Sequence, residues 1–393
     1  MIRFSSRTPG DYRPNRLNAA LAARRAAGGA VLDLTLTNPT RAGLSYPGQA
    51  ILEALNDPRA LTYDPTPRGL NEAREAVAAY HTARGQSAQP DRLLLTGSTS
   101  EAYGWLFKLL CEPGDEVLAP RPSYPLFECL AVLDAVRIQE YPLPEELRWG
   151  LDLEALERCR TPRTRAVVLV NPNNPTGAYL QRDQWLRLQT WAASRGLAII
   201  ADEVFFDYAW QARRGRVSTF DATGEALVFT LSGLSKAAGL PQMKLGWIHA
   251  SGPTRLLAEA LDRLDWIADA YLPVSAPVQH AAAAWIKLLP EIQASITERC
   301  RENLATARSA FSAAGGARAL LPEGGWSVVL DVPRLHTEEE WTLRLLEGQG
   351  VLVQPGFFFD FEREALLVAS LLSAPGDFRE GLAGLERALL GPG

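Results

Sequence analysis

The stretch AVVLVNPNNPTG, residues 166–177, joins a run of apolar residues to a polar turn. Ala166 to Val170 is rich in β-branched residues and predicts a strand that is buried on both faces. The asparagine, proline and glycine residues of Asn171 to Gly177 end that strand in a turn. The chain repeats this unit, a short apolar strand that ends in polar residues, at several other positions.

Short apolar runs alternate with helical patterns on both sides of this stretch. Such alternation predicts an α/β fold, with a large domain built on a mostly parallel sheet that helices cover on both faces. The other strands are predicted at Leu93 to Thr96, Glu116 to Ala119, Leu197 to Ala201, Leu227 to Leu231 and Leu245 to His249, and helices at Ser100 to Leu110, Gln184 to Ser194 and Pro253 to Ala270.

Polar clusters follow four of the predicted strands. Sheets of this kind bind ligands at the carboxyl ends of their strands, where the strand order reverses. We therefore expect a functional site along that edge of the sheet. The four clusters are Gly97-Ser98-Thr99-Ser100, Asn171 to Gly177, Asp202-Glu203 and Ser235-Lys236.

With 393 residues, the chain is longer than one hydrophobic core normally organises, so a second domain is expected. A long amphipathic helix is predicted from Ile292 to Ala314, followed by short strands and a final helix. We predict an N-terminal arm with part of a smaller α+β domain over residues 1–45, the large domain over 46–290, and the remainder of the small domain over 291–393.

Charge and composition exclude several classes of function. The net charge is -5 without a long block of one sign, so no nucleic-acid surface is indicated. No apolar run approaches the ~20 residues that span a bilayer, and Met1 to Arg16 lacks the apolar core of a secretory signal. We therefore expect a soluble, cytoplasmic protein. The histidines have no metal-ligand spacing, and serine-hydrolase, P-loop and dinucleotide motifs are absent; the histidines are His81, His249, His280 and His336.

One lysine stands in a context that suggests chemistry. The chain has four lysines among its 40 basic residues, and Lys236 follows a predicted strand among small residues. A partly desolvated lysine loses its proton and can attack an aldehyde to form an imine. Taken alone, Lys236 would be read as a surface lysine in a loop.

The motifs around Lys236 form an ordered set. In order and spacing this set resembles the class I and II aminotransferases, which are pyridoxal-phosphate enzymes of fold type I, and the resemblance runs from about Asn38 to Ser370. The cofactor that it implies is pyridoxal 5′-phosphate. The motifs are Tyr63 to Leu70, Gly97 to Glu101, Glu112 to Val117, Pro122 to Pro125, Asn171 to Gly177, Ala201 to Glu203 and Ser235-Lys236.

The resemblance implies three catalytic residues. Lys236 would hold the cofactor as a Schiff base and then move a proton between the substrate and the cofactor. Asp202 would pair with the pyridine nitrogen, although the same residue could be a plain helix cap. Tyr124 would stack on the pyridine ring, where a core tyrosine is the alternative.

The remaining implied contacts hold the cofactor and the substrate. Asn174 would donate to the phenolic oxygen of the cofactor, and Tyr63 would reach the phosphate in the neighbouring subunit, which implies a homodimer. The phosphate would lie at the start of a helix, and the residues that bind it would be Thr99, Ser100, Ser235 and Lys244. Asn38 and Asn174 are the predicted substrate contacts.

The sequence departs from the family in several places. The family has an arginine that binds the phosphate where this chain has Lys244. A lysine offers a single point charge, whereas an arginine offers two parallel N–H donors. Phe205 replaces a tyrosine that would donate to the cofactor, which predicts a raised Schiff-base pKa compared with a Phe205→Tyr variant. A serine three residues before Lys236 is replaced by Gly233. The arginine that binds the substrate carboxylate is replaced by Val368. Either Asn38, Asn174, Arg41 or an arginine of the partner subunit takes its place, or the substrate is not an ordinary α-amino acid.

Two reactions are compatible with these residues. The leading interpretation is an aminotransferase, which passes an amino group from an amino donor to a 2-oxo acid through the Lys236 Schiff base. The alternative is a carbon-sulfur β-lyase of the same fold, which needs no acceptor. A regulatory module fused to a DNA-binding domain is disfavoured because the ~45 residues before the large domain are too few and not basic enough. The sequence names no particular amino acid.

Overall fold

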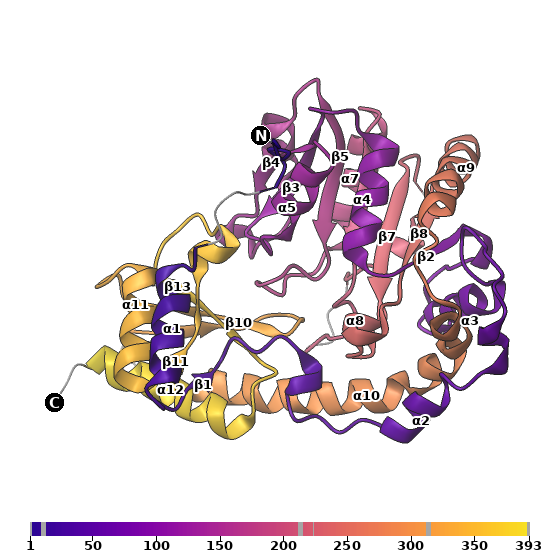
Figure 1. Cartoon of the computed structure of the whole chain (residues 1–393). Coiled ribbons are helices and arrows are strands. Elements are labelled where there is room, and N and C mark those ends of the chain that lie inside the picture. The colour runs from indigo at the N-terminus through magenta and orange to yellow at the C-terminus, as the bar shows by residue number, and fades with distance from the viewer. Residues whose placement is uncertain (1, 9–12, 211–214, 223, 312–315, 391–393) are drawn as a thin grey trace.

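The computed structural model describes residues 2–8, 13–210, 215–222, 224–311 and 316–390. A seven-stranded sheet forms the centre of the large domain (Figure 1). Six of its strands are parallel to one another, and β8 alone runs against its two neighbours. In spatial order the strands are β2 (Leu93–Thr96), β8 (Gly246–Ser251), β7 (Val228–Gly233), β6 (Ala198–Asp202), β5 (Thr164–Val170), β3 (Glu116–Arg121) and β4 (Arg137–Pro142).

Helices cover both faces of this sheet, as predicted. Alternate residues of β5 point to opposite faces: Ala166 and Val168 belong to one apolar core, and Val167 and Leu169 to another. The first core includes residues of α4 (Thr99–Leu110), α5 (Leu126–Leu133) and α9 (Thr254–Tyr271). The second includes residues of α6 (Leu153–Cys159) and α7 (Arg182–Ala193).

A second sheet and its helices form the smaller unit. Its four antiparallel strands lie in the order β12 (Gln354–Pro355), β13 (Leu366–Ser370), β10 (Ser327–Asp331) and β9 (Arg318–Leu320). The N-terminal region joins this unit because β1 (Leu32–Asp33) pairs in parallel with β11 (Val351–Leu352). The accompanying helices are α1 (Arg16–Ala26), α11 (Glu338–Arg344) and α12 (Pro375–Leu390).

One long helix connects the two parts. We predicted it to start at Ile292, but α10 (Ala276–Ser309) begins well before and continues through Pro290 (Figure 1). A proline inside a helix removes one backbone hydrogen bond. That loss is offset because the helix buries Trp285, Leu289 and Ile296 in the core shared by α3 (Asn71–Thr82) and the small unit. Residues 312–314 of the predicted helix lie outside the described residues, and the domain boundary at residue 290 stays a prediction.

The sheet edge contains one strand that was not predicted. β4 has the sequence RIQEYP, and only Tyr141 in it is buried. β4 carries no apolar run because most of its side chains are exposed or half-buried, whereas β2 at the opposite edge of the sheet is fully buried. None of the helices in the described part of the chain is both long and apolar enough to cross a membrane. Short helices complete the fold: α2 (Gly48–Glu53) in the N-terminal region and α8 (Leu234–Ala237) directly after β7.

Candidate active site

The four predicted polar clusters lie at one edge of the large sheet. β2, β5, β6 and β7 are mutually parallel, so their carboxyl ends face the same way. α8 follows β7 directly and carries Lys236. The Lys236 Nζ atom lies 5.7 Å from the ring centroid of Phe205 and 5.5 Å from that of Trp326. Burial among these groups lowers the pKa of the Lys236 amine, and the nearby Asp202 charge opposes that shift.

Asp202 is the last residue of β6, and its carboxyl group has two donors. The Tyr103 hydroxyl donates to Oδ2 at 3.3 Å, and the Val204 backbone N–H donates to Oδ1 at 3.2 Å. Burial nevertheless raises the pKa of Asp202 to about 6. Tyr103 was not predicted as part of the site. Its position one helical turn after Thr99, facing the sheet, is the signal that could have identified it.

The turn after β5 places Asn174 between the two sheets. The Asn174 Oδ1 atom accepts a hydrogen bond of 3.3 Å from the Ser327 hydroxyl of β10. Within the described part of the chain, the Asn174 Nδ2 group donates to no acceptor. Gly177 allows the turn to touch the small unit, because an added β-carbon would lie 2.4 Å from the Gly324 carbonyl oxygen. Ser327 escaped the sequence analysis because the contact joins residues far apart in the chain.

A second buried carboxylate holds these strand ends together. Glu203 follows Asp202 and accepts hydrogen bonds from the Asn171 side chain at 2.9 Å, the Ser218 hydroxyl at 2.6 Å and the Thr219 backbone at 2.7 Å. Burial raises the pKa of Glu203 to about 7, and the donors around it oppose that rise. Glu203 thus fixes the start of the Asn171 turn against the end of β6.

Tyr124 stands at the same edge in the loop between β3 and α5. Its side chain is 50% exposed, so one face of the ring is free to contact a ligand. The neighbouring backbone is held on both sides: the Ser123 N–H donates to the Phe359 carbonyl at 2.9 Å, and the Asn173 side chain donates to the Pro122 carbonyl at 3.0 Å.

Two of the predicted phosphate residues, Thr99 and Ser100, lie in the first turn of α4. The Ser98 hydroxyl caps this helix by accepting from the Glu101 N–H at 3.2 Å. Over the described residues, the backbone N–H groups of Thr99 and Ser100 have no acceptor, which leaves them available to an anion. Burial raises the pKa of Glu101, and the charge of the nearby Lys244 opposes that rise. Ser235 lies beside Lys236 at the start of α8.

Two other predicted residues, Tyr63 and Asn38, are exposed. Tyr63 is 80% exposed and lines a groove of about 170 Å³ together with Leu272 and Ser275, a groove that none of the residues around Lys236 lines. Asn38 is exposed, and its Oδ1 atom accepts from the backbone and hydroxyl of Thr40 at 3.1 and 2.8 Å. Its part in substrate binding stays a prediction.

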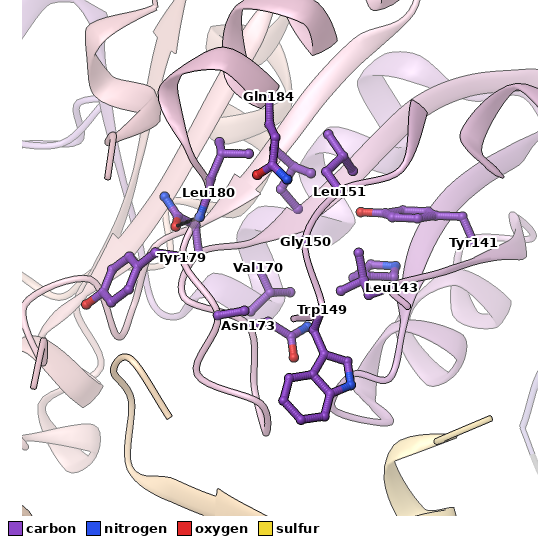
Figure 2. Close-up of a pocket in the computed structure, with 14 residues that line it drawn as sticks. Tyr141, Leu143, Trp149, Gly150, Leu151, Val170, Asn173, Tyr179, Leu180 and Gln184 are labelled. Atoms are coloured by element: carbon purple, nitrogen blue, oxygen red, sulfur yellow. Dashed lines mark hydrogen bonds between the residues drawn. The ribbon is translucent and has the colours of Figure 1, made fainter. Parts of the chain in front are cut away.

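A small cavity lies behind the Asn171 to Gly177 turn, with the side chains of Trp149, Tyr179 and Asn173 around it (Figure 2). Its volume of about 30 Å³ is on the order of one water molecule. A cofactor of the predicted size does not fit in this cavity, so the candidate site is defined by the residues at the strand ends around Lys236.

The structure bears on two departures from the family pattern, at Gly233 and at Val368. A β-carbon at Gly233 would lie 2.9 Å from the Cα of Gly246, so no side chain fits at that position. Val368 is 2% exposed and lies on β13 opposite Val329. It offers no charge to a substrate carboxylate.

Comparison with known proteins identifies the family. Residues 31–390 match the family described as aminotransferase class I and II. The glutamate-pyruvate aminotransferase AlaA of Escherichia coli is 28% identical over 342 residues, which cover 85% of this chain and 84% of that protein. The S-alkyl-thiohydroximate lyase SUR1 of Arabidopsis thaliana is 29% identical over 223 residues, covering 55% of this chain and 48% of that protein.

Solved structures agree with this family. An aminotransferase from Escherichia coli superposes with a TM-score of 0.85 at 25% identity, and covers 100% of this chain and 99% of its own. The alanine aminotransferase from Pyrococcus furiosus has the same fold, with a TM-score of 0.86 at 24% identity over 99% of this chain and 100% of its own. The chain therefore belongs to the class I and II aminotransferases, and it is an enzyme of the transaminase type.

Proposed function

We propose that this aminotransferase uses pyridoxal phosphate, bonded covalently through Lys236, to pass an amino group from an amino acid to a 2-oxo acid. The observation that carries the proposal is the pair of ionisable side chains at the ends of β6 and β7. The pKa of the Lys236 amine is lowered and the pKa of Asp202 is raised to about 6, both chiefly by burial. Perturbed pairs of this kind are characteristic of catalytic sites.

The donors around this pair fit the chemical groups of the cofactor. Asp202 would face the ring nitrogen, and a proton held between them removes the cost of a buried carboxylate charge. The free Asn174 Nδ2 group would donate to the phenolic oxygen, and Tyr124 would cover one face of the ring. Bound pyridoxal phosphate supplies an aldehyde for the substrate amine and a ring that accepts electrons from the substrate α-carbon.

The phosphate would be held where the sheet edge meets α4. The free N–H groups of Thr99 and Ser100 would donate to phosphate oxygens, aided by the helix dipole. Ser235 would add a hydroxyl donor, and Lys244 would add a positive charge. The nearby Glu101 carboxyl is already engaged by the Gly97 N–H at 2.7 Å.

During the reaction the residues of this chain would perform two tasks. Asp202 would keep the ring nitrogen protonated, and Tyr103 would hold the Asp202 carboxyl group in place. The Lys236 amine would hold the cofactor and would take and give back a proton at the substrate α-carbon, while the bound cofactor would supply the ring that accepts electrons. A lowered pKa favours this task because the amine must accept a proton near neutral pH.

We propose small amino acids and 2-oxo acids as substrates, with alanine, glutamate and pyruvate as the first to test. The relatives named glutamate-pyruvate aminotransferase and alanine aminotransferase support this choice. The lyase SUR1 aligns with about half of the chain, so β-elimination has weaker support. We also propose a homodimer in which Tyr63 reaches the site of the partner. A cytoplasmic location stays a prediction.

The direct test measures pyruvate and glutamate formed from L-alanine and 2-oxoglutarate by the protein loaded with pyridoxal phosphate. The wild-type protein is expected to form both products in equal amounts. Lys236→Ala should form neither, whereas Lys287→Ala, which removes an exposed lysine of α10, should match the wild type. Equal rates in the Lys236→Ala and wild-type proteins would refute the proposed role of Lys236.

A further inference from the structure

The face of the small sheet that looks onto the site offers no free cation among its described residues, because Arg318 on it is paired with Asp331 at 2.9 Å. Ser327 contacts Asn174 from this face, and the antiparallel register places Val329, Val368 and Ser370 on it as well. The intervening residues of β10 and β13 point instead into the core of the small unit. Gln354 of β12 lies opposite Val368 and is also uncharged. A substrate carboxylate therefore needs a cation from another element.

A segment of the N-terminal region crosses from this sheet to the catalytic lysine. At one end, the Ser370 N–H donates to the Leu34 carbonyl at 2.7 Å, and the Ser370 hydroxyl donates to the Leu36 carbonyl. At the other end, the Tyr46 hydroxyl donates to the carbonyl of Gly239 at 2.9 Å, three residues after Lys236. In Figure 1 the segment that follows β1 passes between β10 and α8.

Arg41 lies at the turn in the middle of this segment. Asn38 caps the turn through Thr40, and a β-carbon added at Gly239 would lie 3.4 Å from the Cβ of Pro39. These contacts fix the backbone of the turn beside the loop that follows Lys236.

The Arg41 side chain is exposed and makes no hydrogen bond or ion pair with any described residue. Two other arginines of the region are neutralised: Arg121 pairs with Glu362 at 2.9 Å, and Arg363 pairs with Glu145 at 2.6 Å. Lys244, the nearest other cation named in the site, lies beside the start of α4 with Glu101. Arg41 therefore has a free guanidinium group, and it lies on the segment that connects the small sheet, which contains Val368, to the loop after Lys236.

We propose that Arg41 binds the α-carboxylate of the substrate and so performs the task that Val368 cannot. The proposal rests on the aminotransferase function proposed above. A guanidinium offers two parallel N–H donors that match the two oxygens of a carboxylate. The backbone of residues 34–46 is held at both ends, so the turn would position the Arg41 guanidinium. Asn38 would contribute by stabilising this turn.

The test compares Arg41→Gln and Arg41→Lys with wild type and with Arg379→Gln, which removes an exposed arginine of α12. Two donors are used with each protein: L-alanine, and L-alaninamide, which lacks the carboxylate. We expect Arg41→Gln to lower kcat/KM for L-alanine about 100-fold, because one partner of a charged pair is lost. For L-alaninamide, kcat/KM of the variant should stay within about twofold of the wild-type value. Arg41→Lys should lie between, and Arg379→Gln should match wild type.

Binding of propionate, the carboxylate without the amino group, gives a readout that needs no turnover. Its dissociation constant should rise about 100-fold in Arg41→Gln with no change in the thermal unfolding temperature. Equal losses for both donors, or unchanged propionate binding, would overturn the role of Arg41. A wild-type protein that turns over no amino donor would instead overturn the proposed function, which separates the two failures.

Discussion

At the scale of single residues, the site depends on two groups whose ionisation the protein shifts in opposite directions. Burial lowers the pKa of the Lys236 amine and raises the pKa of the Asp202 carboxyl group to about 6. Both shifts favour the neutral form of the group, which costs the protein stability whenever the charged form is imposed. A cofactor with a basic ring nitrogen would relieve this cost at Asp202.

Asp202 therefore makes the stability of the cofactor-free protein depend on pH. Burial raises the pKa of folded Asp202 above the ordinary aspartate value of 3.8, so the folded state keeps a proton that the unfolded state has lost. Stability should fall as pH rises from about 4 to about 6 and then remain constant, with a total loss of about 3 kcal/mol from this group.

Asp202→Asn removes this dependence on pH. The free energy of unfolding of the variant should therefore rise relative to that of the wild type as pH increases from about 4 to about 6. Chemical unfolding of the two cofactor-free proteins at pH 4, 5, 6 and 7 measures the gain. Asp183→Asn, which replaces an exposed carboxylate of α7, should show no such trend. A difference between Asp202→Asn and wild type that stays constant with pH would contradict the assignment.

Phe205 provides the second prediction at this scale. Its ring lies beside Lys236 and packs edge-on against Trp326 at a centroid distance of 5.2 Å. Phe205→Tyr would add a donor to the phenolic oxygen of the bound cofactor and stabilise the deprotonated form. A pH titration of the visible absorbance band should give a pKa lower by about one unit in the variant than in wild type. Identical titration curves would show that the phenylalanine has no such effect.

Sequence reasoning reached the residues that motifs carry and missed those that tertiary contacts supply. Lys236, Asp202 and Asn174 were predicted because each follows a strand within a recognisable pattern. Tyr103 and Ser327 contact Asp202 and Asn174 from other elements, and a single tyrosine or serine carries no such pattern. These pairs are 99 and 153 positions apart in the chain, and their proximity requires the folded chain.

At the scale of elements, the start of α4 is the predicted phosphate site. Lys244 lies in the turn before β8 with a positive φ of 53°, and its charge acts on Glu101 in the first turn of α4. Two residues later, a β-carbon added at Gly246 would lie 3.2 Å from the Ser98 backbone. The exposed amine of Lys244 would neutralise part of the phosphate charge.

Lys244→Gln should therefore raise the dissociation constant of pyridoxal phosphate about tenfold, because one charge-assisted contact is lost. Fluorescence titration of the cofactor-free protein measures it. Lys287→Gln, on the exposed side of α10, is the matched control. Equal cofactor affinity in the Lys244→Gln and wild-type proteins would place the phosphate elsewhere.

The strands and helices themselves were predictable to different degrees. Strands buried on both faces, such as β2 and β5, have continuous apolar runs that fix their position. β4 lacks such a run because most of its side chains are exposed or half-buried, and the start of α10 was missed because Pro290 resembles a helix break. In both cases packing against neighbours outweighed the local signal.

At the scale of the whole molecule, the parts of the site come from both structural units. The large domain contributes Lys236 and Asp202, and the small unit contributes Ser327 and Trp326. Tyr63 and its groove with Leu272 lie apart from this set on an exposed surface. A symmetric dimer that joins these surfaces would bring Tyr63 to the partner's phosphate site.

Mixing two inactive variants tests the dimer. Lys236→Ala lacks the catalytic lysine, and Tyr63→Ala lacks the residue proposed to reach across the interface. In a mixed dimer one site carries both defects and the other neither. Equal amounts refolded together should regain about a quarter of wild-type activity, because half of the dimers are mixed and each has one intact site. No activity above that of the separate variants would place Tyr63 in its own subunit's site.

The most direct test of the central claim is a count of products without an acceptor. The protein loaded with pyridoxal phosphate is incubated with L-alanine alone, and pyruvate and ammonia are measured against the concentration of active sites. An aminotransferase should form about one pyruvate per site and no ammonia, because the amino group stays on the cofactor until a 2-oxo acid arrives. No pyruvate from L-alanine, together with continued release of pyruvate, ammonia and thiol when an S-alkyl-L-cysteine replaces L-alanine, would contradict transamination and assign the chain to the eliminating enzymes of this fold.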